Sequence, residues 1–188
     1  DDNTIVIFLG DNGTDRKVYT KNNNVLVKGS KGLTNKFGTN IPLIISWSKL
    51  KKIKTEQTPL VDLIDFYSTF EDLLNVKKKT SNGVSLMPLL LGENFDERKY
   101  ITTYYNPMWG SLYKNRAVYI QNKKYKLYKS GDFYNYQLDP EENHPISLKN
   151  LDESIMNMHT EMDSILKKVP ELPEINFNNW QEKLRPSN

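Results

Sequence analysis

The chain has 188 residues, and a formal net charge of +3 with 26% charged residues is typical of a soluble globular protein. This small charge does not predict a nucleic-acid partner. No stretch approaches the roughly 20 apolar residues that would span a bilayer. The absence of cysteine excludes disulfides, thiolate metal ligands and a cysteine nucleophile, and two histidines are too few for an all-protein zinc site without several carboxylates.

Two continuous apolar runs, residues 4–9 and 42–47, predict strands that are buried on both faces of a largely parallel sheet. Between them, residues 14–40 are polar and rich in glycine, asparagine and lysine, which predicts a long and mostly irregular connection. A buried-type strand needs sheet neighbours on both sides. Because the first run starts only three residues into the chain, we expect the numbering to begin within a longer protein.

The pattern then changes to the period of a helix over residues 58–75, with Thr58 as a possible cap. Its apolar face would consist of Leu60, Leu63, Ile64, Tyr67, Phe70 and Leu74. A short apolar piece follows at 84–91. We place a boundary near residue 95, which divides the chain into 1–95, part of an α/β domain, and 96–188, a smaller subdomain.

The second part predicts four short strands, joined by turns, at 100–105, 116–120, 124–128 and 133–138. This is an antiparallel meander with one face open to water. A helix at about 148–168 follows, and the tail is extended. The apolar side of that helix would carry Leu151, Ile155, Met158, Met162, Ile165 and Leu166, with His159 solvated on the opposite side.

Two short motifs have a structural and a functional interpretation. Asp11-Asn12-Gly13 ends the first strand and is a turn signal, but its carboxylate and amide oxygens also suit Ca²⁺ or Mg²⁺ at the edge of an open sheet. Lys31, between glycines, is either one lysine of a mobile loop or a clamp for a tetrahedral oxyanion. Trp109, between strands, is a candidate aromatic contact to substrate.

In order and spacing, these motifs resemble the C-terminal signature of the sulfatase family, within the alkaline-phosphatase superfamily. That signature runs strand, Asp-Asn-Gly, loop, Lys-Gly-x-x-x-Glu-Gly-Gly-x-Arg-x-Pro, strand. The segment Lys31–Pro42 matches it without a gap, Gly83–Leu90 resembles the family's Gly-x-Ser-Leu-x-Pro-Leu-Leu, and Tyr136–Asn143 resembles its Tyr-x-Leu-x-x-Asp-Pro-x-Glu ending. The resemblance covers residues 4 to about 166.

The resemblance implies an alkaline-phosphatase-like α/β fold and a sulfuric ester hydrolase. Asp11 and Asn12 match two ligands of a Ca²⁺ beside the substrate sulfate, and Lys31 matches the lysine that contacts a sulfate oxygen. Two positions depart from the family pattern: Lys36 stands for the usual Glu and Asn40 for the usual Arg. In the family, those positions support the loop.

The family's nucleophile, a formylglycine made from Cys or Ser in Cys/Ser-x-Pro-x-Arg, has no counterpart here. We therefore expect it upstream, in an N-terminal part of the same enzyme, and expect these 188 residues alone to be inactive. The resemblance implies a sulfate ester as substrate, such as a sulfated glycan, and a periplasmic or secreted location. A phosphodiesterase or phosphonate hydrolase on the same fold, and a degenerate module that binds a glycan or a partner, are the alternatives.

Overall fold

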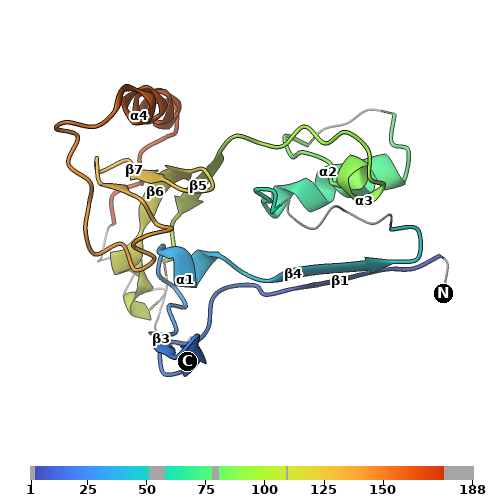
Figure 1. Cartoon of the computed structure of the whole chain (residues 1–188), viewed down its shortest axis with the longest axis horizontal. Helices are drawn as coiled ribbons and strands as arrows, with labels where there is room; N and C mark the ends of the chain where they lie inside the picture. The colour runs from blue at the N-terminus through green and yellow to red at the C-terminus, as the bar shows by residue number, and fades with distance from the viewer. Residues whose placement is uncertain (1–2, 51–57, 78–80, 109, 176–188) are drawn as a thin grey trace, which may run out of the picture.

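The computed structural model describes residues 3–50, 58–77, 81–108 and 110–175. Figure 1 shows two regions: a long two-stranded ribbon with two helices beside it, and a four-stranded sheet that carries the last helix. The loop around α1 (Lys36–Thr39) lies between the ribbon and the sheet. In the part of the chain that the structure describes, no helix combines the length and apolar character needed to cross a membrane.

The ribbon consists of β1 (Ile5–Leu9) and β4 (Leu43–Trp47), so both predicted strands form. They pair with each other in antiparallel register, and Ile7 lies opposite Ile45. The prediction of a largely parallel sheet is therefore wrong for the described residues, because the segment between the strands returns the chain in the opposite direction. Burial on both faces is also wrong: the outward side chains of Val6, Phe8 and Ile44 are about 60% exposed.

The connection between these strands is more ordered than predicted. β2 (Tyr19–Asn22) and β3 (Val25–Lys28) form an antiparallel hairpin. Its turn residues, Asn23 and Asn24, have φ values of 45° and 66°. Two successive positive φ values twist a two-residue turn in the sense that a hairpin requires, and asparagine tolerates them well. The pair Asn23-Asn24 is therefore the feature of the sequence that indicates the hairpin.

The helix predicted at 58–75 is shorter than expected, and it buries its polar face instead of its apolar face. α2 (Ile64–Leu73) buries Asp65, Ser68, Thr69 and Glu71, whereas its apolar side chains Leu63, Ile64, Tyr67, Phe70 and Leu74 are exposed. Thr58 lies well before the observed start, and no side chain caps the helix.

An ion pair accounts for this orientation of α2. The buried carboxylate of Asp65 pairs with the guanidinium of Arg98 and accepts the backbone N–H of Val84 at 2.7 Å. These bonds hold the polar side of α2 against the segments before and after α3 (Met87–Leu90). A buried carboxylate is stable only when it is paired in this way, so its bonds override the apolar pattern.

The predicted meander and last helix are confirmed. β5 (Ile101–Tyr105), β6 (Ala117–Gln121), β7 (Lys126–Tyr128) and β8 (Phe133–Tyr134) form one antiparallel sheet in that order, and the 3₁₀ helix η1 (Gly110–Asn115) precedes β6. The last strand is shorter than predicted, because residues 136–138 form a turn.

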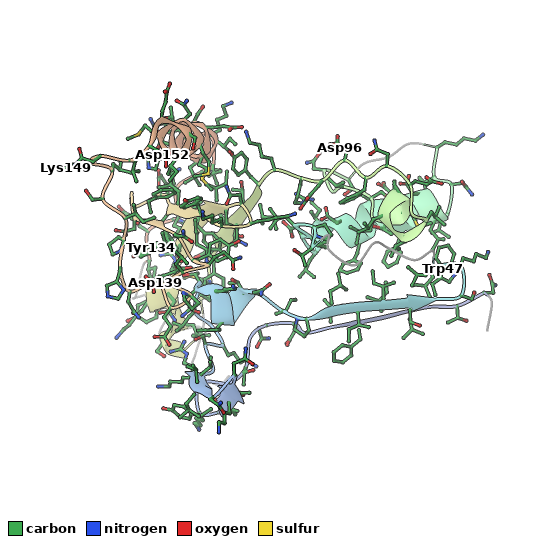
Figure 2. All side chains as sticks on the ribbon, viewed as in Figure 1. Trp47, Asp96, Tyr134, Asp139, Lys149 and Asp152 are labelled. Atoms are coloured by element: carbon green, nitrogen blue, oxygen red, sulfur yellow. The ribbon has the colours of Figure 1, made fainter. Side chains whose placement is uncertain are left out.

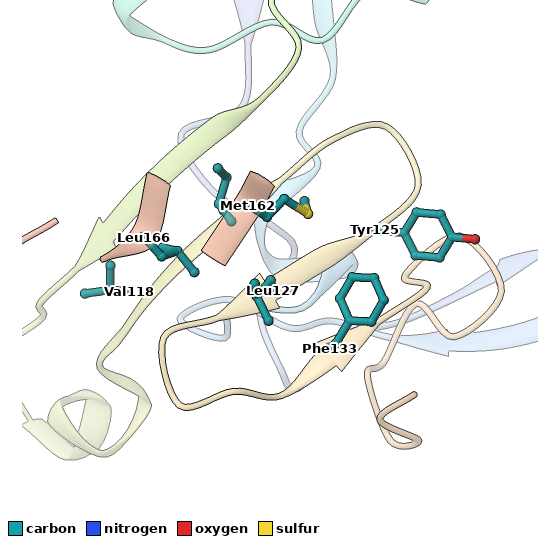
Figure 3. Packing of buried hydrophobic residues seen from close by; sticks show 7 residues of the cluster. Val118, Tyr125, Leu127, Phe133, Met162 and Leu166 are labelled. Carbon is teal, nitrogen blue, oxygen red and sulfur yellow. The ribbon is translucent and has the colours of Figure 1, made fainter. Parts of the chain in front are cut away.

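α4 (Glu153–Leu166) begins at Asp152, whose side chain accepts the N–H of Ile155. Met162 and Leu166 of α4 pack on the sheet, and with Val118, Ile120, Tyr125, Leu127 and Phe133 they form the hydrophobic core (Figure 3). His159 is half-buried with its ring edge-on to Phe133, so the prediction that it is solvated is wrong.

Candidate functional site

A cleft of about 1010 Å³ lies between the ribbon, α2, α3 and the four-stranded sheet. Its polar lining includes Asp11, Asn12, Lys36, Asn40, Lys123 and Gln137. Its apolar lining includes Leu9, Ile45, Phe66, Leu86 and Leu89. The predicted site residues Asp11 and Asn12 follow the end of β1, beside α1.

Asp11 and Asn12 are placed beside α1 by short backbone contacts. The N–H of Gly10 donates to the carbonyl of Pro42 at 3.3 Å, and the N–H of Gly13 donates to the carbonyl of Gly38 at 3.0 Å. A Cβ atom on Gly13 would lie 2.0 Å from the carbonyl oxygen of Phe37. Only glycine permits this approach, so Gly13 holds Asp11 and Asn12 against α1.

Lys31 lies on a neighbouring loop that is fixed through its backbone. Its N–H donates to the carbonyl of Thr14 at 2.9 Å, and its carbonyl accepts from Nε of Arg16 at 2.8 Å. The Lys31 side chain is exposed and is not among the residues that line the cleft, whereas the next residue, Gly32, is. The loop of Lys31 thus borders the cleft, and its role toward substrate stays a prediction.

The four-stranded sheet holds this loop from the other side at Gly32. The carbonyl of Gly32 accepts Nδ2 of Asn115 at 2.9 Å and the hydroxyl of Tyr105 at 3.4 Å. Gly32 has a φ of 80°, which glycine adopts without a steric cost. Asn115 and Tyr105 therefore determine where the chain runs directly after Lys31.

A second attachment to the sheet occurs at Thr34. The ammonium of Lys126 donates to the Thr34 carbonyl and, at 2.6 Å, to Oε1 of Glu142. The hydroxyl of Tyr128 donates to the Glu142 carboxylate and, at 2.9 Å, accepts the hydroxyl proton of Thr34. Figure 2 labels two residues near this attachment, Tyr134 and Asp139, beside α1.

This junction is buried and electrostatically unusual. Lys126 is fully buried, and its ammonium lies 4.7 Å from the centroid of the Tyr119 ring and 5.4 Å from that of Tyr136. Burial lowers the pKa of Lys126, while the carboxylate of Glu142 acts in the opposite direction. Burial raises the pKa of Tyr119 to about 12 and that of Tyr136 to about 12. Both phenols are therefore neutral at physiological pH.

The structure thus brings Asp11 and Asn12 together in one cleft, beside the loop of Lys31. Trp109 lies outside the described residues. The residues that sequence reasoning missed are Arg16, Tyr105, Asn115, Lys126, Tyr128 and Glu142, which hold the loop rather than face the cleft. Glu142 lies in the Tyr136–Asn143 motif, but no motif indicates that these residues hold the loop, because Asn115 and Lys126 are 83 and 92 residues from their partners.

A calcium ion fits this donor set in part. A carboxylate and an amide oxygen are suitable hard ligands, but Ca²⁺ requires six to eight oxygens. Within the described ranges, no cluster of three or more His, Asp or Glu side chains is arranged to hold a metal. Further ligands would have to come from outside these side chains.

An α/β fold with a glycine-rich loop beside an Asp-Asn pair is what the resemblance to the C-terminal region of a sulfatase predicts. Residues 31–169 match the family described as N-sulphoglucosamine sulphohydrolase, C-terminal, and the chain belongs to this family. The predicted resemblance and the α/β fold class are thereby confirmed. A comparison with curated protein sequences finds no match.

Two solved structures show the same fold. One, from Bacteroides thetaiotaomicron VPI-5482, is assigned to the sulfatases; it is 22% identical, with a TM-score of 0.57 over 88% of this chain and 36% of that chain. The other is BT4656 in complex with its substrate D-glucosamine-2-N,6-O-disulfate; it is 22% identical, with a TM-score of 0.55 over 98% of this chain and 36% of that chain. The chain thus spans about a third of the length of these relatives.

Proposed function

We propose that this chain is the C-terminal part of a sulfuric ester hydrolase and that it supplies part of the metal site and one wall of the substrate pocket. The observation that carries this proposal is that Asp11 and Asn12 line one cleft, directly beside the loop of Lys31. Membership of a sulfatase C-terminal family supports the same reaction class.

Each residue has a distinct role in this proposal. Asp11 would hold a Ca²⁺ through its carboxylate and Asn12 through its neutral amide oxygen. A metal bound there would supply Lewis-acid stabilisation of charge on the sulfuryl group. Lys31 would donate to a sulfate oxygen and offset negative charge that develops in the transition state.

The remaining chemistry requires a further part of the enzyme, which we place upstream. The relatives are about two and a half times as long as this chain. The outward faces of β1 and α2 expose large apolar side chains, among them Phe8 and Tyr67, which in a folded protein usually mark a contact surface. We propose that the N-terminal part covers these faces and carries the formylglycine nucleophile and the other metal ligands.

A sulfated glucosamine is the substrate class that the comparisons support best. BT4656 was solved with such a sugar, and the matching family is described by an N-sulphoglucosamine activity. The cleft lining contains the ammonium of Lys36 and the amides of Asn40 and Gln137, which can bind sulfate and hydroxyl groups. Because sulfatases are typically periplasmic or secreted, we propose the same location for this enzyme.

The test uses the full-length protein and sulfated glucosamines as substrates. Asp11→Asn should lower calcium affinity and reduce kcat/KM by about 100-fold or more, the size of effect seen when one strong transition-state interaction is lost. Asp15→Asn is the matched control: Asp15 lies four residues away, outside the cleft lining, and its carboxylate accepts the local N–H of Lys17. Equal calcium affinity in both variants would refute the assignment of Asp11.

The competing proposal is a degenerate module that binds a glycan or a partner. The departures at Lys36 and Asn40 favour it, since both residues line the cleft. The two proposals differ in the full-length protein, because a binding module needs neither calcium nor turnover. The isolated chain should be inactive under either proposal, and turnover by residues 1–188 above an Asp11→Ala control would contradict both.

A further inference from the structure

Lys36 differs from Lys123, the other lysine in the cleft lining. In the part of the chain that the structure describes it forms no ion pair, and its ammonium donates to the neutral Oε1 of Gln137 at 2.7 Å. Lys123, in the same cleft, is paired with the carboxylate of Glu97 at 2.8 Å. The positive charge of Lys36 is therefore available to a ligand, whereas that of Lys123 is already balanced.

The Lys36 side chain is also held in position. Its backbone N–H donates to the carbonyl of Pro140 at 3.1 Å, and Nε2 of its partner Gln137 donates to the carbonyl of Lys123 at 2.6 Å. One proton of the ammonium is used by Gln137, which leaves two for a ligand. Because its acceptor is neutral, Lys36 keeps most of its attraction for an anion. Because its side chain is already oriented, it loses less conformational entropy when the anion binds.

The position of Lys36 relative to the proposed metal site completes the argument. Gly38, two residues further in α1, accepts the N–H of Gly13, so Lys36 and the Asp11-Asn12 pair lie on adjoining segments of one cleft wall. Two separate positively charged centres would result: the metal at Asp11 and Asn12, and the ammonium of Lys36. A sugar with one anionic group can occupy only one of them.

We propose that Lys36 forms an anion subsite that binds a second sulfate group of the substrate, the one that is not hydrolysed. The enzyme would therefore prefer a doubly sulfated glucosamine to a singly sulfated one. This inference rests on the proposed sulfatase function and adds the determinant of its specificity. A charge-assisted hydrogen bond of this kind corresponds to a preference of about 10-fold or more.

The experiment measures kcat/KM of the calcium-loaded, full-length enzyme on D-glucosamine-2-N,6-O-disulfate, N-acetylglucosamine 6-O-sulfate and glucosamine 2-N-sulfate. The wild type should prefer the disulfate to whichever monosulfate it hydrolyses. Lys36→Gln, which keeps the backbone bond, should reduce that preference by about 10-fold. Lys36→Arg should retain most of it.

Lys123→Gln is the matched control, because it removes a charge from the same cleft that Glu97 already neutralises. A second readout is calorimetric affinity for the singly sulfated product of the disulfate, which should weaken about 10-fold in Lys36→Gln and not in Lys123→Gln. An active wild type with an unchanged preference and unchanged product affinity in Lys36→Gln would overturn the subsite alone. A wild type inactive on all three sugars would overturn the proposed function and the subsite with it.

Discussion

The ammonium of Lys126 lies 2.6 Å from Oε1 of Glu142, and side chains that are 0% and 6% exposed make this a buried ion pair. Lys126 belongs to β7 and Glu142 to the turn region after β8, while the Thr34 carbonyl that shares the ammonium belongs to the loop of Lys31. The pair thus connects the four-stranded sheet to the candidate site. A charge in such surroundings is stable only while its partner is present.

Breaking this pair should therefore destabilise the protein strongly. Lys126→Met leaves the Glu142 carboxylate buried without its partner, and we expect a loss of about 3–5 kcal/mol in unfolding free energy. The double variant Lys126→Met/Glu142→Gln should lose less than the sum of the two single variants, because it removes both charges. Urea unfolding of the full-length protein measures these differences. Additive single effects would show that the two side chains do not stabilise each other.

Gly13 should be required for metal binding because of its contact with α1. In Gly13→Ala the new Cβ would lie 2.0 Å from the Phe37 carbonyl oxygen, so the segment with Asp11 and Asn12 must move away. We expect calcium affinity of the full-length protein to fall about 10-fold or more, since a shift of about 1 Å takes ligands out of reach.

Gly10→Ala is the matched control for Gly13→Ala, because its Cβ would meet neighbours only at an ordinary 3.5 Å. Calorimetric titration with Ca²⁺ compares the two variants. Similar affinities in Gly13→Ala and Gly10→Ala would mean that the close approach to α1 does not position the ligands.

Asn115 should act on catalysis through the loop that it holds. Asn115→Ala removes the donor to the Gly32 carbonyl, and we expect kcat/KM on a sulfated glucosamine to fall about 10-fold, the equivalent of one hydrogen bond of about 1.4 kcal/mol. Calcium affinity should not change, because Asn115 contacts neither Asp11 nor Asn12. Asn143→Ala, which loses only a local bond to Glu141, serves as control. A fall in calcium affinity as large as that in kcat/KM would indicate general disruption instead.

The buried tyrosines predict a loss of stability at alkaline pH. Burial raises the pKa of Tyr119 and of Tyr136 to about 12, whereas an unfolded chain ionises its tyrosines near pH 10. Between about pH 10 and 12 the unfolded state therefore binds fewer protons than the folded state, and stability falls as pH rises. Lys126 acts in the opposite direction, because burial lowers its pKa.

The measurement compares the urea midpoint at pH 9 and pH 11.5 in wild type and in Tyr119→Phe. Each tyrosine contributes a loss of up to about 1.4 kcal/mol per pH unit in this window, so Tyr119→Phe should lose less stability between the two pH values. Tyr19→Phe, at an exposed position of β2, should behave as wild type. A decline of equal size in all three proteins would exclude burial of Tyr119 as its cause.

Local patterns in the sequence were sufficient for most of the elements, although not for the β2–β3 hairpin or the start of α2. Apolar runs and turn signals located β1, β4 and the four strands of the meander, and the spacing of Ile155, Met158 and Met162 located α4 and its buried side. The order of motifs also predicted Asp11 and Asn12 as metal ligands. Both line the cleft, as expected for neighbours in the chain, and their role toward a metal stays a prediction.

Tertiary structure alone decided which faces are buried and how the site is held. The spacing in α2 shows which residues share a face, but the pair of Asp65 with Arg98, 33 residues apart, determines that the polar face turns inward. Lys126, Glu142 and Asn115 reach the loop of Lys31 from distant segments, and the free charge of Lys36 depends on Gln137, 101 residues away. Periodicity reports neighbours along the chain, whereas the energy of a buried charge depends on partners that only folding brings within reach.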